Sequence, residues 1–179
     1  MTGPRPIVLD ASVAMALLID EPEGTLVGTV LERWTTEMRT LAVPAHFWLE
    51  VVNRLAREPR ATGADILKAV HRLDSLELET VEISRPLLLQ AIDRMERTGL
   101  TAYDAIYLAL AESLDAQLAT FDSALAAAAG DRLEPIDGQH RASDSAAIYE
   151  HDVTWPNYKE AAAYLAKLRA EALAGRTSG

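Results

Sequence analysis

The chain has 179 residues and no cysteine, and its 27 Asp and Glu outnumber its 17 Lys and Arg to give a formal net charge of −10. This length and a hydrophobic content of 49% indicate one domain with a short extension, while the lack of cysteine excludes a disulfide scaffold and cysteine-based zinc sites. Because there is no apolar run of 18 residues and no signal-peptide pattern, we expect a cytoplasmic protein with no membrane contact, whose acidity disfavours nucleic-acid binding through bulk charge.

Strand-like and helix-like segments alternate along the chain. The expected strands cover residues 6–10, 41–43, 79–83 and 117–121, with 132–136 as a candidate edge strand. The expected helices cover residues 13–19 (capped by Ser12), about 26–34, 44–57 (opened by Pro44), 66–76, 86–98, 101–114 and 123–129. This alternation predicts an α/β fold in which helices cover both faces of a parallel sheet.

Four acidic side chains interrupt these apolar patterns, and each has an ordinary structural interpretation beside a functional one. Asp10 ends the first strand, where it could be a turn residue, and Asp122 follows the strand over 117–121. Glu50 lies about 130° from the centre of its helix's apolar stripe, where it could simply pair with Arg54 on a solvated face. Asp104 lies three residues after Thr101, so it could be a helix-capping residue.

The functional interpretation is that these acids converge. In a parallel α/β sheet, the carboxyl ends of the strands and the N-termini of the following helices lie at the same edge. Carboxylates gathered there raise one another's pKa unless a cation binds, and hard divalent ions such as Mg²⁺ or Mn²⁺ prefer oxygen ligands. The four acids therefore predict a divalent-metal site. His46 shares the polar side of the helix over 44–57 and is expected to be a surface residue.

Four segments of the sequence together resemble the motifs of PIN-domain ribonucleases, and VapC-type toxins of bacterial toxin–antitoxin pairs most. They are VLDAS at 8–12, VPAHFWLEVVN at 43–53, TAYDAIYLA at 101–109 and LATFD at 118–122. The resemblance covers roughly residues 5–137 and implies an α/β/α sandwich with a central parallel sheet. It also implies Mg²⁺- or Mn²⁺-dependent endoribonuclease activity, a homodimer, and inhibition by a cognate VapB-type antitoxin.

Carried over by position, the resemblance implies an acidic quartet with two supporting hydroxyl groups, namely Asp10, Glu50, Asp104 and Asp122 with Ser12 and Thr120. We expect Asp10 and Asp104 to bind the metal directly and the other two acids to complete the site or act through water. The metal would activate a water molecule for attack on the phosphodiester, leaving a 5′-phosphate and a 3′-hydroxyl. As a hypothesis, Arg54 and Arg57 hold flanking RNA phosphates.

Other interpretations remain open. A haloacid-dehalogenase-like phosphatase would need a second acid at position 12, where this chain has serine. A catalytically silent PIN-like module that binds RNA or protein would be expected to lack one of the acids. We assign residues 1–137 to the nuclease-like domain and 138–179 to a linker with an amphipathic C-terminal helix. That helix either folds back on the domain, contacts a partner or covers the cleft.

Overall fold

A four-stranded parallel sheet forms the centre of the protein. The structure, a computed structural model, describes residues 3–19 and 22–136. The strands are β1 (Ile7–Leu9), β2 (Leu41–Pro44), β3 (Glu79–Val81) and β4 (Gln117–Ala119). All of them are parallel, in the order β3-β2-β1-β4. Because the chain passes from β1 to β2 on one side while β4 pairs with the other side of β1, the order reverses between β1 and β4, which is where ligands bind in open α/β sheets.

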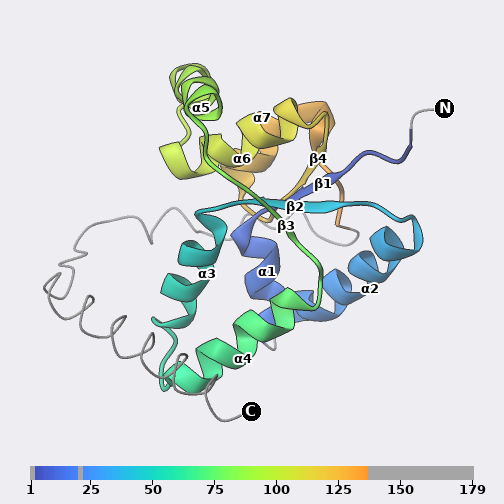
Figure 1. Ribbon diagram of the computed structural model, residues 1–179, viewed down its shortest axis with the longest axis vertical. Helices are drawn as coiled ribbons and strands as arrows, with labels where there is room; N and C mark the ends of the chain where they lie inside the picture. Colours follow the sequence, from blue (N-terminus) through green and yellow to red (C-terminus); the bar gives the residue numbers. More distant parts are fainter. Residues whose placement is uncertain (1–2, 20–21, 137–179) are drawn as a thin grey trace, which may run out of the picture. The chain divides into compact units, whose positions relative to one another are not determined.

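Helices cover both faces of this sheet. In the described part of the chain they are α1 (Ala11–Leu18), α2 (Pro22–Thr36), α3 (Phe47–Leu55), α4 (Gly63–Asp74), α5 (Arg85–Thr98), α6 (Ala102–Ser113) and α7 (Ser123–Ala129), followed by the 3-10 turn η1 (Gly130–Arg132). Figure 1 shows α5, α6 and α7 on one side of the sheet and α1 to α4 on the other. The predicted α/β/α sandwich with a central parallel sheet is therefore confirmed.

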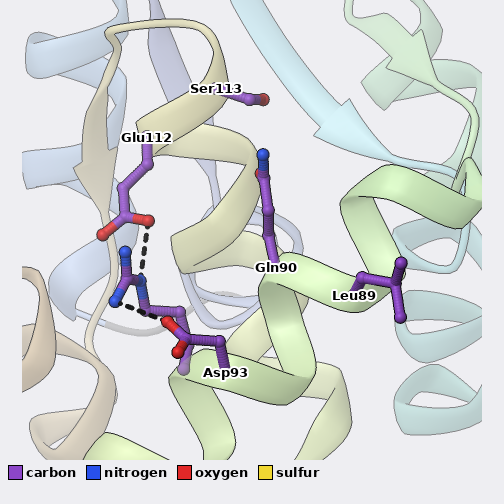
Figure 2. A pocket seen from close by; sticks show the side chains of 6 residues that line it. Leu89, Gln90, Asp93, Glu112 and Ser113 are labelled. Carbon is purple, nitrogen blue, oxygen red and sulfur yellow. Dashed lines mark hydrogen bonds and ion pairs between the residues drawn. The ribbon is translucent and has the colours of Figure 1, made fainter.

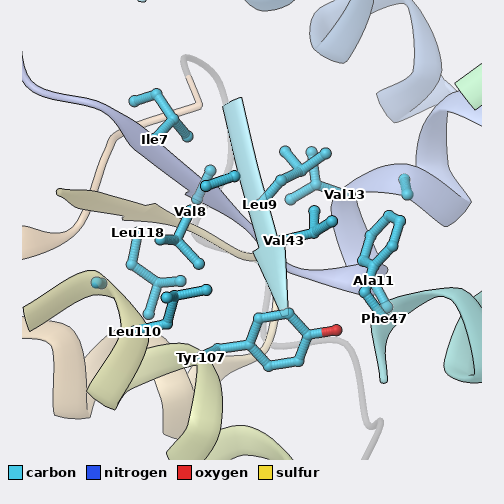
Figure 3. Packing of buried hydrophobic residues seen from close by; sticks show 14 of the residues in the cluster. Ile7, Val8, Leu9, Ala11, Val13, Val43, Phe47, Tyr107, Leu110 and Leu118 are labelled. Atoms are coloured by element: carbon cyan, nitrogen blue, oxygen red, sulfur yellow. The ribbon is translucent and has the colours of Figure 1, made fainter. Parts of the chain in front are cut away.

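The core lies on both faces of β1, whose three residues are fully buried. Figure 3 shows these residues packed with Val43 and Leu118 of the neighbouring strands and with Phe47, Leu110 and Tyr107 from the helices. The Tyr107 ring lies inside this core, and its hydroxyl group points toward the side of Ala11 and Phe47. Burying a side chain of this size stabilises the folded state by about 1.5–3 kcal/mol. The core formed by these side chains therefore holds the ends of the strands in place.

Two expected helix starts are wrong. Pro44 ends β2 instead of opening a helix, because the next residue, Ala45, still donates its backbone N–H to Val81 O of β3 (2.9 Å), and a turn over residues 45–46 follows. As a result α3 begins only at Phe47. Ser12 does not cap α1, since the helix already begins at Ala11 and the hydroxyl group of Ser12 donates to Asp10.

Helix α6 is buried between layers over residues 105–111, whereas Tyr103 and Leu114 at its ends are 58% and 38% exposed. The segment after α7 differs from expectation. Residues 132–136 form no strand, because only one isolated bridge joins Leu133 to Leu118. The expected linker and C-terminal helix over 138–179 lie outside the described residues. None of the helices within those residues is long and apolar enough to cross a membrane.

Candidate functional site

Asp10 is a buried carboxylate held by two hydroxyl groups. It follows β1 directly and is only 4% exposed. Its Oδ2 accepts hydrogen bonds from Ser12 Oγ (2.5 Å) and Thr120 Oγ1 (2.7 Å). Because both donors are neutral, they orient the carboxylate without cancelling its charge, and burial raises the pKa of Asp10 above its usual value.

Thr120 links the end of β1 to the turn after β4. Its Oγ1 accepts the backbone N–H of Asp122 (2.9 Å) while it donates to Asp10. The Ser12 hydroxyl group similarly accepts the backbone N–H of Phe121 (3.0 Å). Asp122 is the N-cap of α7, since its Oδ1 accepts the N–H of Leu125 (2.7 Å). The two hydroxyls predicted as supporting groups thus fix the relative position of two of the acids.

Glu50 approaches the same edge from the first turn of α3. Its Oε2 accepts a hydrogen bond from the hydroxyl group of Tyr107 on α6 (3.0 Å). Burial, followed by the nearby charge of Asp10, raises the pKa of Glu50 to about 7. Arg54, one helical turn farther along α3, acts in the opposite direction, because its positive charge lowers the pKa of both Glu50 and Asp10.

Asp104 combines the two interpretations that the sequence left open. Thr101 is the N-cap of α6 and accepts the backbone N–H of Asp104 (3.3 Å), while its hydroxyl group donates to Asp104 Oδ2 (2.6 Å). Burial raises the pKa of Asp104, and the charges of Asp10 and Asp122 raise it further. Asp104 is therefore a capping residue that also lies within the electrostatic influence of the other acids.

The structure brings all four predicted acids to the carboxyl edge of the sheet, where they influence one another's protonation. The charge of Arg54 acts on two of them, whereas Arg57 is exposed just beyond the end of α3. Across residues 3–19 and 22–136, no three acidic or histidine side chains stand close enough to form a ready-made metal cage. The donor set, carboxylates supported by hydroxyl groups under mutual repulsion, fits a hard divalent ion.

Three aromatic rings adjoin these acids, and none of them was predicted as part of the site. His46 lies between Tyr103 (ring centroids 5.7 Å apart, tilted) and Tyr107 (4.9 Å, edge to face). Its expected place on an open polar surface is wrong, because both ring nitrogens are buried and have no hydrogen-bond partner among the described residues. Burial lowers the pKa of His46 to about 4, so the ring is neutral at neutral pH.

A second buried carboxylate, Glu134, lies at the opposite edge of the sheet. It accepts hydrogen bonds from Trp34 Nε1 (3.0 Å), Arg33 Nη2 (2.9 Å) and Arg39 Nη1 (3.0 Å). Arg39 also donates to the backbone carbonyl of Arg5 and to the side chain of Gln117, residues that precede or start β1 and β4. This cluster ties the amino ends of the strands to α2, and sequence reasoning missed it.

A hollow of about 410 Å³ lies between α5 and α6, away from the four acids. Figure 2 shows its labelled lining residues: Leu89, Gln90, Asp93, Glu112 and Ser113. Arg94 spans it, with Nε 2.8 Å from Glu112 and Nη1 3.0 Å from Asp93. Because acids of the same chain bind this arginine, we assign the hollow to the contact between α5 and α6 and not to a ligand.

Residues 7–131 match the family model of the PIN domain, so the chain belongs to the PIN-domain family. The fold resembles that of VapC20 from Mycobacterium tuberculosis, a toxin that cleaves the sarcin–ricin loop. That match has a TM-score of 0.58 at 19% identity and covers 72% of this chain and 99% of VapC20.

Two further solved structures share the fold. A toxin–antitoxin complex from Klebsiella pneumoniae matches with a TM-score of 0.53 at 19% identity, over 65% of this chain and 87% of that one. A protein from Pyrobaculum aerophilum matches with a TM-score of 0.52 at 26% identity, over 69% and 79%. No curated protein sequence is significantly similar to this chain.

Proposed function

We propose that this PIN-domain protein is a Mg²⁺- or Mn²⁺-dependent endoribonuclease and the toxin of a type II toxin–antitoxin module. The observation that carries the proposal is the meeting of Asp10, Glu50, Asp104 and Asp122 at one edge of the sheet, where their charges act on one another. Membership of the PIN family and the likeness to solved toxins support it.

In this proposal Asp10 and Asp104 bind the metal directly, and Glu50 and Asp122 complete the site or act through water. A bound Mg²⁺ or Mn²⁺ would activate a coordinated water and offset the charge of the phosphodiester. The chain's own part is orientation. Hydroxyl groups of Ser12, Thr120, Thr101 and Tyr107 each donate to one of the acids, which fixes carboxylate rotamers before a ligand arrives.

Arg54 is proposed to contact an RNA phosphate next to the acids, since it already lies within electrostatic range of Asp10 and Glu50. Arg57 is proposed for a more distant phosphate. Charge reversal, Arg54→Glu or Arg57→Glu, should weaken RNA binding while Mn²⁺ binding persists. Loss of Mn²⁺ binding in these variants would contradict this role for the arginines.

The proposal includes a cytoplasmic homodimer that a VapB-type antitoxin inhibits. The solved neighbours include a toxin–antitoxin complex, which supports a protein partner. The proposal also includes the division of the chain into a nuclease domain over 1–137 and an extension over 138–179. Light scattering on the purified chain gives the oligomeric state, and co-expression with a neighbouring gene product identifies an inhibitor.

The decisive experiment is cleavage of a mixed pool of structured RNAs by the full chain. We expect discrete fragments with 5′-phosphates in Mg²⁺ or Mn²⁺ and none in EDTA. Asp104→Asn should abolish cleavage, whereas Asp74→Asn, which changes an exposed acid at the end of α4, should not. RNA binding without cleavage, equal in wild type and Asp104→Asn, would instead favour the silent binding module.

A further inference from the structure

Tyr103 is a large apolar side chain left in solvent beside the acids. It is 58% exposed, although residues 105–111 of the same helix are buried. It directly precedes Asp104, at the N-terminal end of α6. Its ring therefore lies at the edge of the sheet where the candidate metal ligands gather.

The ring is supported from within the protein. His46, from the turn between β2 and α3, contacts Tyr103 with ring centroids 5.7 Å apart, and the His46 ring in turn packs edge to face on Tyr107. Tyr107 is fully buried and donates to Glu50. A row of three rings thus connects an exposed aromatic surface to the core and to one of the acids, which limits how far Tyr103 can move.

An exposed, supported aromatic ring beside a phosphodiester site suits a nucleobase. Unpaired bases stack on tyrosine with little sequence preference, and recognition of RNA mostly uses bases that lie outside a duplex. The net charge of −10 makes such an uncharged contact valuable, because bulk electrostatics repels the RNA backbone.

We propose that Tyr103, backed by His46, is a stacking platform for one unpaired base of the RNA next to the phosphodiester at the acidic edge. This inference rests on the proposed ribonuclease function and narrows its substrate to RNA with an unstacked base at the cleavage site. A tyrosine at a protein interface would have similar exposure. The position next to Asp104 favours RNA, as does the charge of Arg54, which acts on Asp10 and Glu50 at the same edge.

The test uses uridine decamers with one central 2-aminopurine, whose fluorescence is quenched when it stacks on an aromatic ring. All proteins are full-length and carry Asp104→Asn, so that the RNA stays intact, and Mn²⁺ is present throughout. We compare Tyr103→Ala, Tyr103→Phe and the control Leu67→Ala, which removes a 55% exposed apolar side chain from α4.

We expect Tyr103→Ala to weaken binding about 5- to 100-fold and to remove the quenching, while Tyr103→Phe and Leu67→Ala retain both. Equal binding and quenching in Tyr103→Ala would overturn the platform, as would equal loss in Tyr103→Phe. Cleavage of the mixed RNA pool by the chain without Asp104→Asn distinguishes failure of the stacking platform from failure of the proposed ribonuclease function. Metal-dependent cleavage there, together with unchanged binding by Tyr103→Ala, rejects only the platform.

Discussion

The two edges of the sheet each bury one carboxyl group, and they stabilise it by different means. At the amino edge, Glu134 is 5% exposed and is bound by two guanidinium groups and an indole N–H. At the carboxyl edge, Asp10 is 4% exposed, and its carboxylate accepts hydrogen bonds from the neutral hydroxyl groups of Ser12 and Thr120. Three more acids lie near it, and the charge of Arg54 offsets part of theirs. Among the described residues, two arginines bind one acid at the amino edge, whereas four acids share one nearby arginine at the carboxyl edge.

The difference in partners indicates a structural role for the buried acid at the amino edge and a functional role for the one at the carboxyl edge. A buried carboxylate matched by its own chain's arginines holds elements together and has no charge left for a ligand. A buried carboxylate without such a partner costs stability, and it is retained where binding an external cation restores the balance. Three experiments test whether the two edges differ in this way.

The largest effect is expected at the amino edge. Glu134→Ala removes the buried carboxylate that binds Arg39, whose side chain is 7% exposed, and leaves the longer contact with the exposed Glu37 as its one ion pair among the described residues. This change should reduce the free energy of unfolding by about 3–5 kcal/mol. Asp10→Asn, the matched change at the other edge, should leave metal-free stability unchanged or higher, because it removes a repelled charge. Urea denaturation of both variants in EDTA measures the difference. Equal destabilisation would show that the two edges are alike.

A smaller effect is expected from pH and metal. The folded-state pKa of Glu50, about 7, lies above its usual 4.5, so the folded protein holds a proton that it loses as pH rises through 7. Without added metal, the melting temperature should therefore fall between pH 5 and pH 8. Mn²⁺ at 100 times its Kd should restore about 2.7 kcal/mol, and its affinity should increase with pH.

Glu50→Gln is the control for this pH dependence. The glutamine cannot titrate, so the fall in melting temperature across pH 5–8 should become shallower in this variant. An unchanged slope would mean that other groups, such as the general excess of surface acids, cause the dependence.

The smallest effect is expected for Tyr107→Phe, which keeps the buried ring and removes the hydrogen bond to Glu50. That bond lowers the pKa of Glu50, so its loss raises the pKa further and leaves less carboxylate for a metal at pH 7. We expect Mn²⁺ affinity to fall about tenfold, or about 1.4 kcal/mol, measured by calorimetry. Identical affinities at pH 7 would remove Tyr107 from the site.

The sequence was informative where a residue's role depends on its place in the topology. Asp10 and Asp122 follow apolar runs that are strands, and parallel strands end at the same edge, so their convergence could be predicted. Glu50 and Asp104 interrupt apolar helix faces near the starts of their helices. Because helices that follow parallel strands begin at the carboxyl edge of the sheet, these two acids could be predicted at the same edge. The fold class followed from the same alternation of strands and helices.

The sequence was uninformative where a role depends on contacts between distant residues. Tyr107 lies in the expected helix over 101–114, but the sequence could not show that its hydroxyl group reaches Glu50, 57 residues away. Glu134 looked like part of an edge strand, because nothing local indicates that two arginines about 100 residues earlier bind it. His46 looked solvated since its covering helix, α6, comes much later in the chain.

The arrangement around Asp10 also has a genetic consequence. One transition in the codon converts Asp to Asn, which is almost the same size and can still accept hydrogen bonds from the two hydroxyl groups. Under the proposed toxin function, a lineage that loses the antitoxin can therefore survive through one missense change at Asp10 that abolishes the proposed chemistry and keeps the protein folded. Inactive descendants are then expected to carry Asn at position 10 more often than truncations, and a folded variant of this kind would still bind a former antitoxin.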